Sequence, residues 1–304
     1  MKNMTIAILG IGGVGGYIGG KLAGARQPGV RTVFIARGQT LDVIRQNGLK
    51  LITEDEGPAI VHPDLVSNDP AAIGAIDLLI CSVKGYDLEE SLKPYAPCIT
   101  PQTVVLPFLN GIGIADKVRA VFPAVDVWEG VIYIAARQLE KGVVQQTGAP
   151  KEILFGGQGG DPRAALDVFT RAGLDARIPA DIDLEVWRKF LFISVMATAT
   201  SFYNSAIGVI RDDAAKYAHV KALLDECYAV ALANGIRVTE DVKASVAQRI
   251  DKTAPAATTS MYADFQKGGH TEVEALTGDV VRLGQQLGVP TPVYADMYRA
   301  LSAR

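Results

Sequence analysis

The hydrophobic pattern of the first part of the chain alternates between short apolar runs and longer mixed segments. Apolar runs occupy residues 5–9 and 32–36, and further runs follow at residues 76–83 and 103–109. Each later run ends in a polar loop, and the intervening segments have helical spacing. Buried strands that alternate with helices are typical of a parallel sheet with helices on both faces. We therefore expect an α/β fold with a doubly wound sheet.

The pattern changes near residue 184, beyond which only helical spacing is found. Apolar residues recur at three- and four-residue intervals around Val220 and Cys227, and Asn234-Gly235 ends that helix. We expect further helices after Thr239, near residue 258 and after residues 271 and 292. The sequence therefore predicts a sheet domain over residues 1–179 and an all-α domain over residues 180–304.

Two segments before the boundary have strand character, at residues 127–137 and 142–147, and we expect them to form an antiparallel pair. The most apolar helix is expected from Phe190 to Tyr203, with Trp187-Arg188-Lys189 at its start. It is shorter than the roughly 20 apolar residues that a membrane span requires. We therefore expect no membrane association.

The first apolar run leads into Gly10-Ile11-Gly12-Gly13-Val14-Gly15, which opens a helix. Glycines at this spacing allow a tight turn, approach of the backbone to a pyrophosphate and close packing of the helix on the sheet. This pattern predicts a Rossmann-type cofactor site. The second strand ends at Arg37, where NAD-binding units carry Asp or Glu and NADP-binding units carry Arg. We expect NADP (NADPH), although an arginine at a strand end is also compatible with simple solvation.

The spacing Gly15-x-x-x-x-Gly20-Lys21 also resembles a phosphate loop. The next residue is Leu22, whereas Mg²⁺ binding in such loops requires Ser or Thr. A nucleoside triphosphatase is therefore the weaker alternative.

Composition excludes several classes of protein. With 304 residues, 49% hydrophobic and 21% charged, the chain is an ordinary globular protein of two domains. A net charge of -3 gives no basic surface for nucleic acid. Three cysteines without a C-x-x-C pair indicate reduced, buried thiols, and three histidines without partners indicate no metal site. No signal-peptide pattern precedes the first strand, so we expect a cytoplasmic protein. We expect a small molecule as its partner, and an exposed apolar face on the helical domain makes a homodimer its candidate assembly.

Candidate chemistry lies after the strands and on one helix face. Lys84 and Asn110 follow the third and fourth apolar runs, where ligands bind in open α/β sheets. Lys189, Ile193 and Ala197 are spaced to share one face of a helix. Each has an alternative structural interpretation, because a lysine can extend to solvent and Asn-Gly favours turns.

A further carboxylate pair, Glu272 and Glu274, follows Thr271. Thr271 and Glu274 have the spacing of a helix capping box, and a carboxylate at Glu272 is favoured in a first helical turn. Local helix chemistry alone therefore accounts for this segment.

Taken together, these motifs resemble the ketopantoate reductase (2-dehydropantoate 2-reductase) family, and the resemblance runs nearly end to end. Its most specific part is the order Ser82-Val83-Lys84, Leu109-Asn110-Gly111, Trp187-Arg188-Lys189 and Ser260-Met261 before Thr271-Glu272. The resemblance implies NADPH-dependent reduction of 2-dehydropantoate to pantoate in pantothenate biosynthesis.

The resemblance also implies roles for single residues. It makes Lys189 and Glu272 catalytic and Ser260 a substrate ligand. It places Asn110 near both the substrate and the nicotinamide, Glu272 near the cofactor, and Arg37 with Lys84 at the 2′-phosphate.

The chain departs from the family where substrate is recognised. The family has asparagines four and eight residues after the lysine, and this chain has Ile193 and Ala197 there. Ser194 and Thr198 lie one residue further on, about 100° around the helix. A more apolar 2-oxo acid, a related NADP-dependent reductase that forms an opine-like product, and an NADPH-binding regulator without activity are therefore the alternatives.

Overall fold

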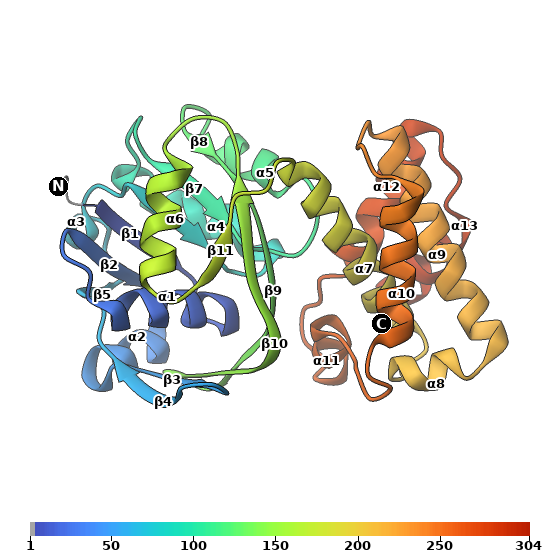
Figure 1. Cartoon of the computed structure of the whole chain (residues 1–304), viewed down its shortest axis with the longest axis horizontal. Helices are drawn as coiled ribbons and strands as arrows, with labels where there is room; N and C mark the ends of the chain where they lie inside the picture. The colour runs from blue at the N-terminus through green and yellow to red at the C-terminus, as the bar shows by residue number, and fades with distance from the viewer. Residues whose placement is uncertain (1–3) are drawn as a thin grey trace. The chain divides into compact units, whose positions relative to one another are not determined.

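The computed structural model describes residues 4–304 and divides into two compact units (Figure 1). Unit 1 runs up to Leu109 and continues over Gly113–Ile182, and unit 2 comprises Asn110–Ile112 and Asp183–Arg304. The short segment that contains Asn110 is thus grouped with the C-terminal part of the chain, which the sequence pattern does not predict.

Unit 1 is built on a parallel sheet of six strands within the described residues, in the order β5-β2-β1-β6-β7-β8. Counted along the chain within this sheet, the order is 3-2-1-4-5-6, which is that of dinucleotide-binding folds. The predicted doubly wound, Rossmann-type sheet is confirmed. Its strands are β1 (Met4–Leu9), β2 (Val30–Ile35), β5 (Leu65–Ser67), β6 (Leu78–Cys81), β7 (Val104–Pro107) and β8 (Asp126–Val127).

Both faces of this sheet are buried, as the apolar runs predict. In β1, Ile6 and Ile8 pack into one core, and Ala7 and Leu9 pack into another on the opposite face. The first core holds α1 (Gly13–Ala25), α2 (Gly38–Asn47) and α6 (Pro162–Arg171). The second holds α3 (Pro70–Ile73), α4 (Leu88–Leu92) and α5 (Ile114–Val121), with the short turns η1 (Gly85–Asp87) and η2 (Lys93–Cys98) beside them.

A second, mixed sheet covers helix α1. It is formed by β3 (Leu49–Thr53), β4 (Gly57–Val61), β9 (Glu129–Glu140), β10 (Val143–Gly156) and β11 (Asp175–Arg177). Strands β9 and β10 form the predicted antiparallel pair and are longer than expected. The sequence pattern misses β3 and β4, because β4 is a short edge strand whose middle residues are exposed, so it carries no apolar alternation.

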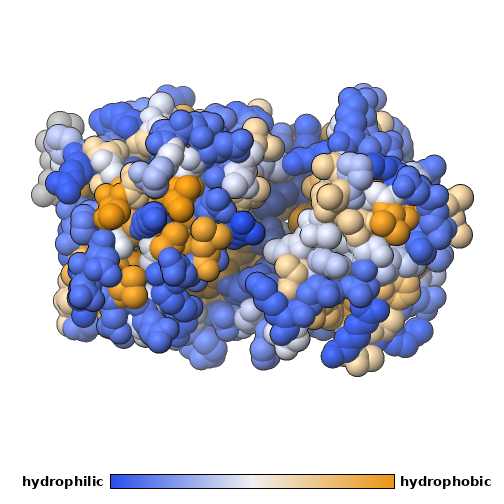
Figure 2. All heavy atoms as spheres, turned by 90° about the horizontal axis from the view of Figure 1, so that it is seen from below, coloured by the Kyte–Doolittle hydropathy of each residue, from blue (hydrophilic) through white to orange (hydrophobic). Residues whose placement is uncertain are grey.

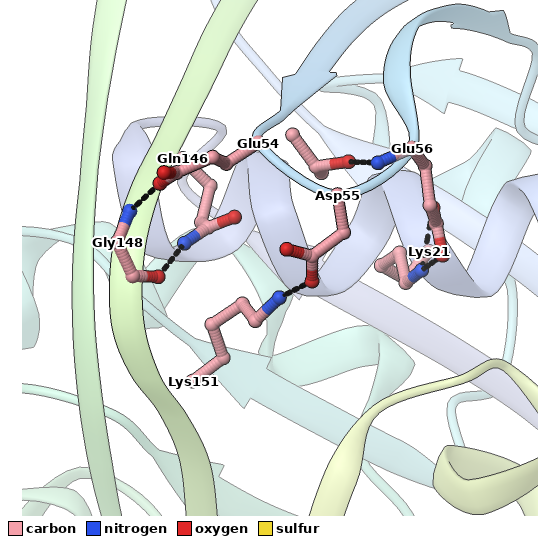
Figure 3. Close-up of polar contacts among 8 residues, drawn as sticks. Lys21, Glu54, Asp55, Glu56, Gln146, Gly148 and Lys151 are labelled. Atoms are coloured by element: carbon pink, nitrogen blue, oxygen red, sulfur yellow. Dashed lines mark hydrogen bonds and ion pairs between the residues drawn. The ribbon is translucent and has the colours of Figure 1, made fainter.

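The acidic turn between β3 and β4 is tied to its neighbours by three side chains (Figure 3). Lys21 of α1 forms an ion pair with Glu56 at 2.6 Å, Lys151 pairs with Asp55, and the Gly148 N–H donates to the Glu54 carboxylate. Gly15, Gly20 and Lys21 all lie inside helix α1, whereas the glycines of a phosphate loop precede the helix. The nucleoside triphosphatase alternative is wrong on this point.

Unit 2 is all-helical in the part of the chain that the structure describes, and α7 (Ile182–Phe202) lies at its centre. This helix begins earlier than predicted, since Asp183 and Glu185 place carboxylates in its first turn, where they are favoured. Around it pack α8 (Ile207–Arg211), α9 (Ala214–Ala233), α10 (Glu240–Lys252), α11 (Ser260–Gln266), the π-helix η3 (Glu274–Gly278), α12 (Asp279–Leu287) and α13 (Pro292–Ser302).

Figure 2 shows a group of hydrophobic residues on one face of unit 1, the face that contains β3 and β4. Ile60 of β4 is 63% exposed. In unit 2, the exposed large apolar residues Val209, Leu232 and Leu287 belong to three different helices. The homodimer stays a prediction. Among residues 4–304, no helix combines the length and hydrophobicity of a bilayer span.

Candidate active site

The glycine motif shapes the turn between β1 and α1. Gly10 has a φ of +93°, which side-chain-bearing residues rarely adopt. A Cβ at Gly12 would meet no atom within 4 Å, whereas a Cβ at Gly15 would lie 2.0 Å from the Gly10 carbonyl oxygen. Open space at Gly12 and close packing at Gly15 are what a pyrophosphate beside a helix N-terminus requires.

A pocket of about 250 Å³ opens beside this turn in unit 1. It is lined by Leu9, Gly10, Ile11, Gly12, Ile35, Ala36, Arg37, Thr40, Val83 and Gln138. The glycine turn and Arg37 therefore share one pocket, as an NADP site requires. Arg37 is exposed and precedes α2, and its Nη2 lies 3.4 Å from the Ser91 hydroxyl. Helix α2 begins at Gly38, directly after Arg37.

Two side chains that support the glycine turn come from distant parts of the sequence. The Ser82 hydroxyl donates to the Gly10 carbonyl at 2.7 Å, and Gln138 of β9 donates to the Ile11 carbonyl at 3.3 Å. Sequence reasoning gave Gln138 no role, because its place in the pocket depends on the pairing of the second sheet.

The remaining candidates in the first half of the chain lie at the carboxyl ends of the sheet strands. Lys84 follows β6 and is half-buried, and Asn110 follows β7 and is also half-buried. Neither belongs to the lining of the pocket around Arg37. The pairing of Lys84 with Arg37 at a 2′-phosphate therefore stays a prediction.

In unit 2, Lys189 is half-buried and lies in α7, seven residues after Ile182, the first residue of the helix. The pKa of Lys189 is lowered to about 8, chiefly by burial; the Glu272 carboxylate opposes this shift and the Arg249 guanidinium adds to it. Glu272 is only 4% exposed. A buried carboxylate that acts on a lysine ammonium is the arrangement expected of a tuned proton donor.

The face of α7 beyond Lys189 is apolar. Ile193 is half-buried, and Ala197 has no exposed surface. Ser194 and Thr198 are fully buried and turn into the core of unit 2. They therefore do not replace the two asparagines of the family on the lysine side of the helix.

The buried hydroxyls bind the π-helix η3 instead. The Ser194 hydroxyl donates to the Leu276 carbonyl at 2.6 Å and lies 2.7 Å from the Tyr294 hydroxyl. Thr198 and Thr277 are linked by a side-chain hydrogen bond of 2.8 Å. These bonds fix η3, which begins two residues after Glu272, against the helix that carries Lys189.

The local explanation of the Glu272 segment as a capping box is wrong. The Glu274 carboxylate accepts from Arg282 Nη1 at 2.6 Å and from the Tyr298 hydroxyl at 2.6 Å. It is therefore not used to accept from the Thr271 backbone N–H, as a capping box requires. A π-helix begins at Glu274, and such turns occur frequently at functional sites.

We predict that Ser194→Ala destabilises the protein by about 1–3 kcal/mol, because the buried Leu276 carbonyl loses its hydroxyl donor. Urea unfolding of the variant measures this change, with Ser245→Ala, an exposed serine of α10, as the control. An unchanged midpoint together with a raised KM for substrate would instead make Ser194 a substrate ligand.

The other candidates in unit 2 are placed as follows. Ser260 is exposed and is the first residue of α11, whose start is capped by the Thr259 side chain. Cys81, Cys98 and Cys227 are free and buried, as expected. Within the described residues, no group of three His, Cys, Asp or Glu side chains is arranged to hold a metal ion.

Comparison with known proteins places both parts of the chain in one family. The model of the ketopantoate reductase PanE/ApbA family matches residues 6–159, and the model of its C-terminal domain matches residues 181–304. Two curated relatives are similar over most of their length. A protein of Bacillus subtilis called uncharacterized oxidoreductase YkpB is 26% identical over 98% of both chains. A 2-dehydropantoate 2-reductase of Halobacterium salinarum is 27% identical and covers 97% of this chain and 98% of its own.

Solved structures give the same result. The crystal structure of 2-dehydropantoate 2-reductase from Porphyromonas gingivalis is 32% identical, with a TM-score of 0.85 over 99% of this chain and 100% of that chain. A PanE/ApbA family ketopantoate reductase from Ralstonia eutropha is 27% identical, with a TM-score of 0.88 over 99% and 98%.

Proposed function

Since the chain belongs to the ketopantoate reductase PanE/ApbA family and is an oxidoreductase of the 2-dehydropantoate 2-reductase type, we propose that it reduces a 2-oxo acid to a 2-hydroxy acid with NADPH. The observation that carries this proposal is Lys189. It is a half-buried lysine with a pKa near 8, acted on by the buried carboxylate of Glu272. Such a group can give a proton at neutral pH and take it back from water.

The pocket beside the glycine turn supports NADPH as the reductant. The N-terminus of α1 offers backbone N–H groups and has no side-chain cap, which suits a pyrophosphate. Arg37 supplies a guanidinium at the end of β2, where the 2′-phosphate of NADPH binds in related folds.

When bound, NADPH supplies a hydride to the carbonyl carbon of the 2-oxo acid. Lys189 donates a hydrogen bond to the carbonyl oxygen and gives it a proton as negative charge develops there. Glu272 keeps Lys189 protonated and oriented, because a nearby carboxylate favours the ammonium form. Asn110 and Ser260 are proposed to hold the substrate, with Asn110 also near the nicotinamide.

We propose 2-dehydropantoate as the substrate, and hence pantoate formation in pantothenate biosynthesis, on the strength of the family. A second candidate is a 2-oxo acid with an apolar side chain. It is favoured by Ile193 on the lysine side of α7, and by the burial of Ser194 and Thr198 away from that side. A site without amide partners discriminates poorly in favour of a hydroxylated substrate.

The proposal is tested by the consumption of NADPH with 2-dehydropantoate beside a panel of straight- and branched-chain 2-oxo acids. We expect turnover with at least one acid, and the largest kcat/KM identifies the substrate. If the protein binds NADPH and turns over none of them, it is the regulator without activity and the proposed function is wrong.

A further inference from the structure

Two carbonyl groups of the glycine turn accept hydrogen bonds from side chains that are distant in the sequence. The Ser82 hydroxyl donates to the Gly10 carbonyl at 2.7 Å. Gln138 Nε2 donates to the Ile11 carbonyl at 3.3 Å, and Gln138 lies 127 residues after Ile11, in β9 of the second sheet. Each bond therefore ties one peptide unit of the turn to another part of unit 1.

These bonds determine where the N–H groups of the turn point. The peptide bonds that join Gly10 to Ile11 and Ile11 to Gly12 are trans. In a planar trans peptide, the carbonyl and N–H groups point in opposite directions. The Ser82 bond thus directs the Ile11 N–H, and the Gln138 bond directs the Gly12 N–H. Among residues 4–304, neither N–H group has a hydrogen-bond acceptor, so both are available to a ligand.

The peptide between Ile11 and Gly12 needs such a bond, because glycine leaves its orientation open. A Cβ at Gly12 would meet no atom within 4 Å, so packing does not hold this residue. Glycine also adopts a wide range of φ values at little cost. Without Gln138, rotation about the bonds beside this peptide would exchange the positions of its N–H and carbonyl groups. A carbonyl oxygen in the place of the Gly12 N–H would repel a pyrophosphate.

Strand β9 is held close enough to make this contact. A Cβ at Gly13 would lie 2.3 Å from the Ala136 carbonyl oxygen, so the β9 backbone lies directly against the first residue of α1. Gln138 follows Ala136 by two residues and is half-buried. It lines the same pocket as Gly12 and Arg37. The close approach of strand and helix at Gly13 thus places Gln138 at the candidate cofactor pocket.

We propose that Gln138 is a positioning residue for the cofactor, whose amide holds the Gly12 N–H toward the pyrophosphate and the Ile11 carbonyl away from it. This inference rests on the proposed function and adds a residue of the second sheet to NADPH binding. The pyrophosphate is common to NADPH and NADH, so Gln138 acts on both cofactors. Arg37, in contrast, is proposed to bind the 2′-phosphate, which only NADPH carries.

The test measures the Kd of NADPH and of NADH by fluorescence titration of the wild type and of Gln138→Met, which keeps the length of the side chain and removes its donor. We expect both Kd values to rise by the same factor, roughly 3- to 10-fold, since one hydrogen bond is lost. Gln138→Glu should raise both further, because a carboxylate cannot donate to the carbonyl and its charge repels the pyrophosphate. The same two substitutions at Gln145 are the matched controls, because Gln145 is half-buried in β10, contacts Arg137 and lies outside the pocket lining.

A second readout separates this positioning role from support of the whole pocket. Displacement of NADPH gives the Kd of two fragments, ADP and adenosine 2′-monophosphate (2′-AMP). ADP contains the pyrophosphate, and 2′-AMP contains the adenine, the ribose and the 2′-phosphate without it. In Gln138→Met, the Kd of ADP should rise as that of NADH does, and the Kd of 2′-AMP should change less than about twofold.

Three outcomes would overturn the inference. Wild-type affinity for both cofactors in Gln138→Met would show that the bond to Ile11 is not needed. A loss confined to NADPH would assign Gln138 to the 2′-phosphate, and an equal loss for 2′-AMP would make it a support of the pocket. A wild type that binds neither NADPH nor NADH contradicts the proposed function itself, so the two failures are distinguishable.

Discussion

Lys189→Ala is expected to lower kcat for NADPH-dependent reduction of a 2-oxo acid by roughly 100- to 10,000-fold, the range typical of a lost general acid. The physical reason is that charge develops on the carbonyl oxygen during hydride transfer, and the variant has no ammonium there to stabilise and protonate it. Steady-state kinetics at saturating NADPH measure the loss. NADPH binding, followed by titration, should stay close to that of the wild type, because the glycine turn and Arg37 are untouched.

The pKa of Lys189 also predicts how the rate of reduction depends on pH. The pKa of Lys189 is lowered to about 8, chiefly by burial, so the ammonium is present below that pH and is lost as the pH rises through it. The kcat/KM for reduction should therefore be highest below about pH 8 and fall above it. Lys252→Ala, at an exposed lysine of α10, should keep the wild-type rate and profile. A wild-type kcat in Lys189→Ala would remove this lysine from the reaction.

Arg37→Ala is expected to raise the KM for NADPH roughly 10- to 100-fold and to leave the KM for NADH nearly unchanged. NADPH and NADH differ only in the 2′-phosphate, so a residue that binds this group affects one cofactor and not the other. Kinetics with both cofactors at saturating 2-oxo acid measure the change in preference.

The matched control for Arg37 is Arg171→Ala, at an exposed arginine of α6 outside the pocket lining. It changes the net charge equally and should alter neither KM. An equal rise in the KM for NADPH and for NADH in Arg37→Ala would show that Arg37 supports the pocket and does not bind the 2′-phosphate.

The part of the fold that depends on local pattern could be predicted. The apolar run of β1, the glycine turn and the end of β2 at Arg37 are neighbours in sequence, and parallel pairing of β1 with β2 brings them into one pocket. Of the second sheet, only the β9–β10 pair could be predicted. Strand β4 is exposed along most of its length, and Gln138 reaches the pocket only through its contact with Ile11, 127 residues away in the sequence.

In the helical unit, helical spacing identified the face of α7 that carries Lys189. It could not show that the Ser194 and Thr198 hydroxyls form hydrogen bonds within the core, since their partners Leu276 and Thr277 lie in a π-helix. A π-helix has no reliable local signal, and the segment had a plausible capping box at its start.

The central claim is that hydride passes from the reduced cofactor to the carbonyl carbon of a 2-oxo acid. It is tested most directly by the panel assay repeated with NADPH that carries deuterium at both C4 positions, followed by mass spectrometry of the product. We predict a 2-hydroxy acid that contains one deuterium, bound to its C2 atom. NADPH oxidation that leaves no deuterium in the acid, or binding of NADPH without its oxidation by any 2-oxo acid, would contradict the account.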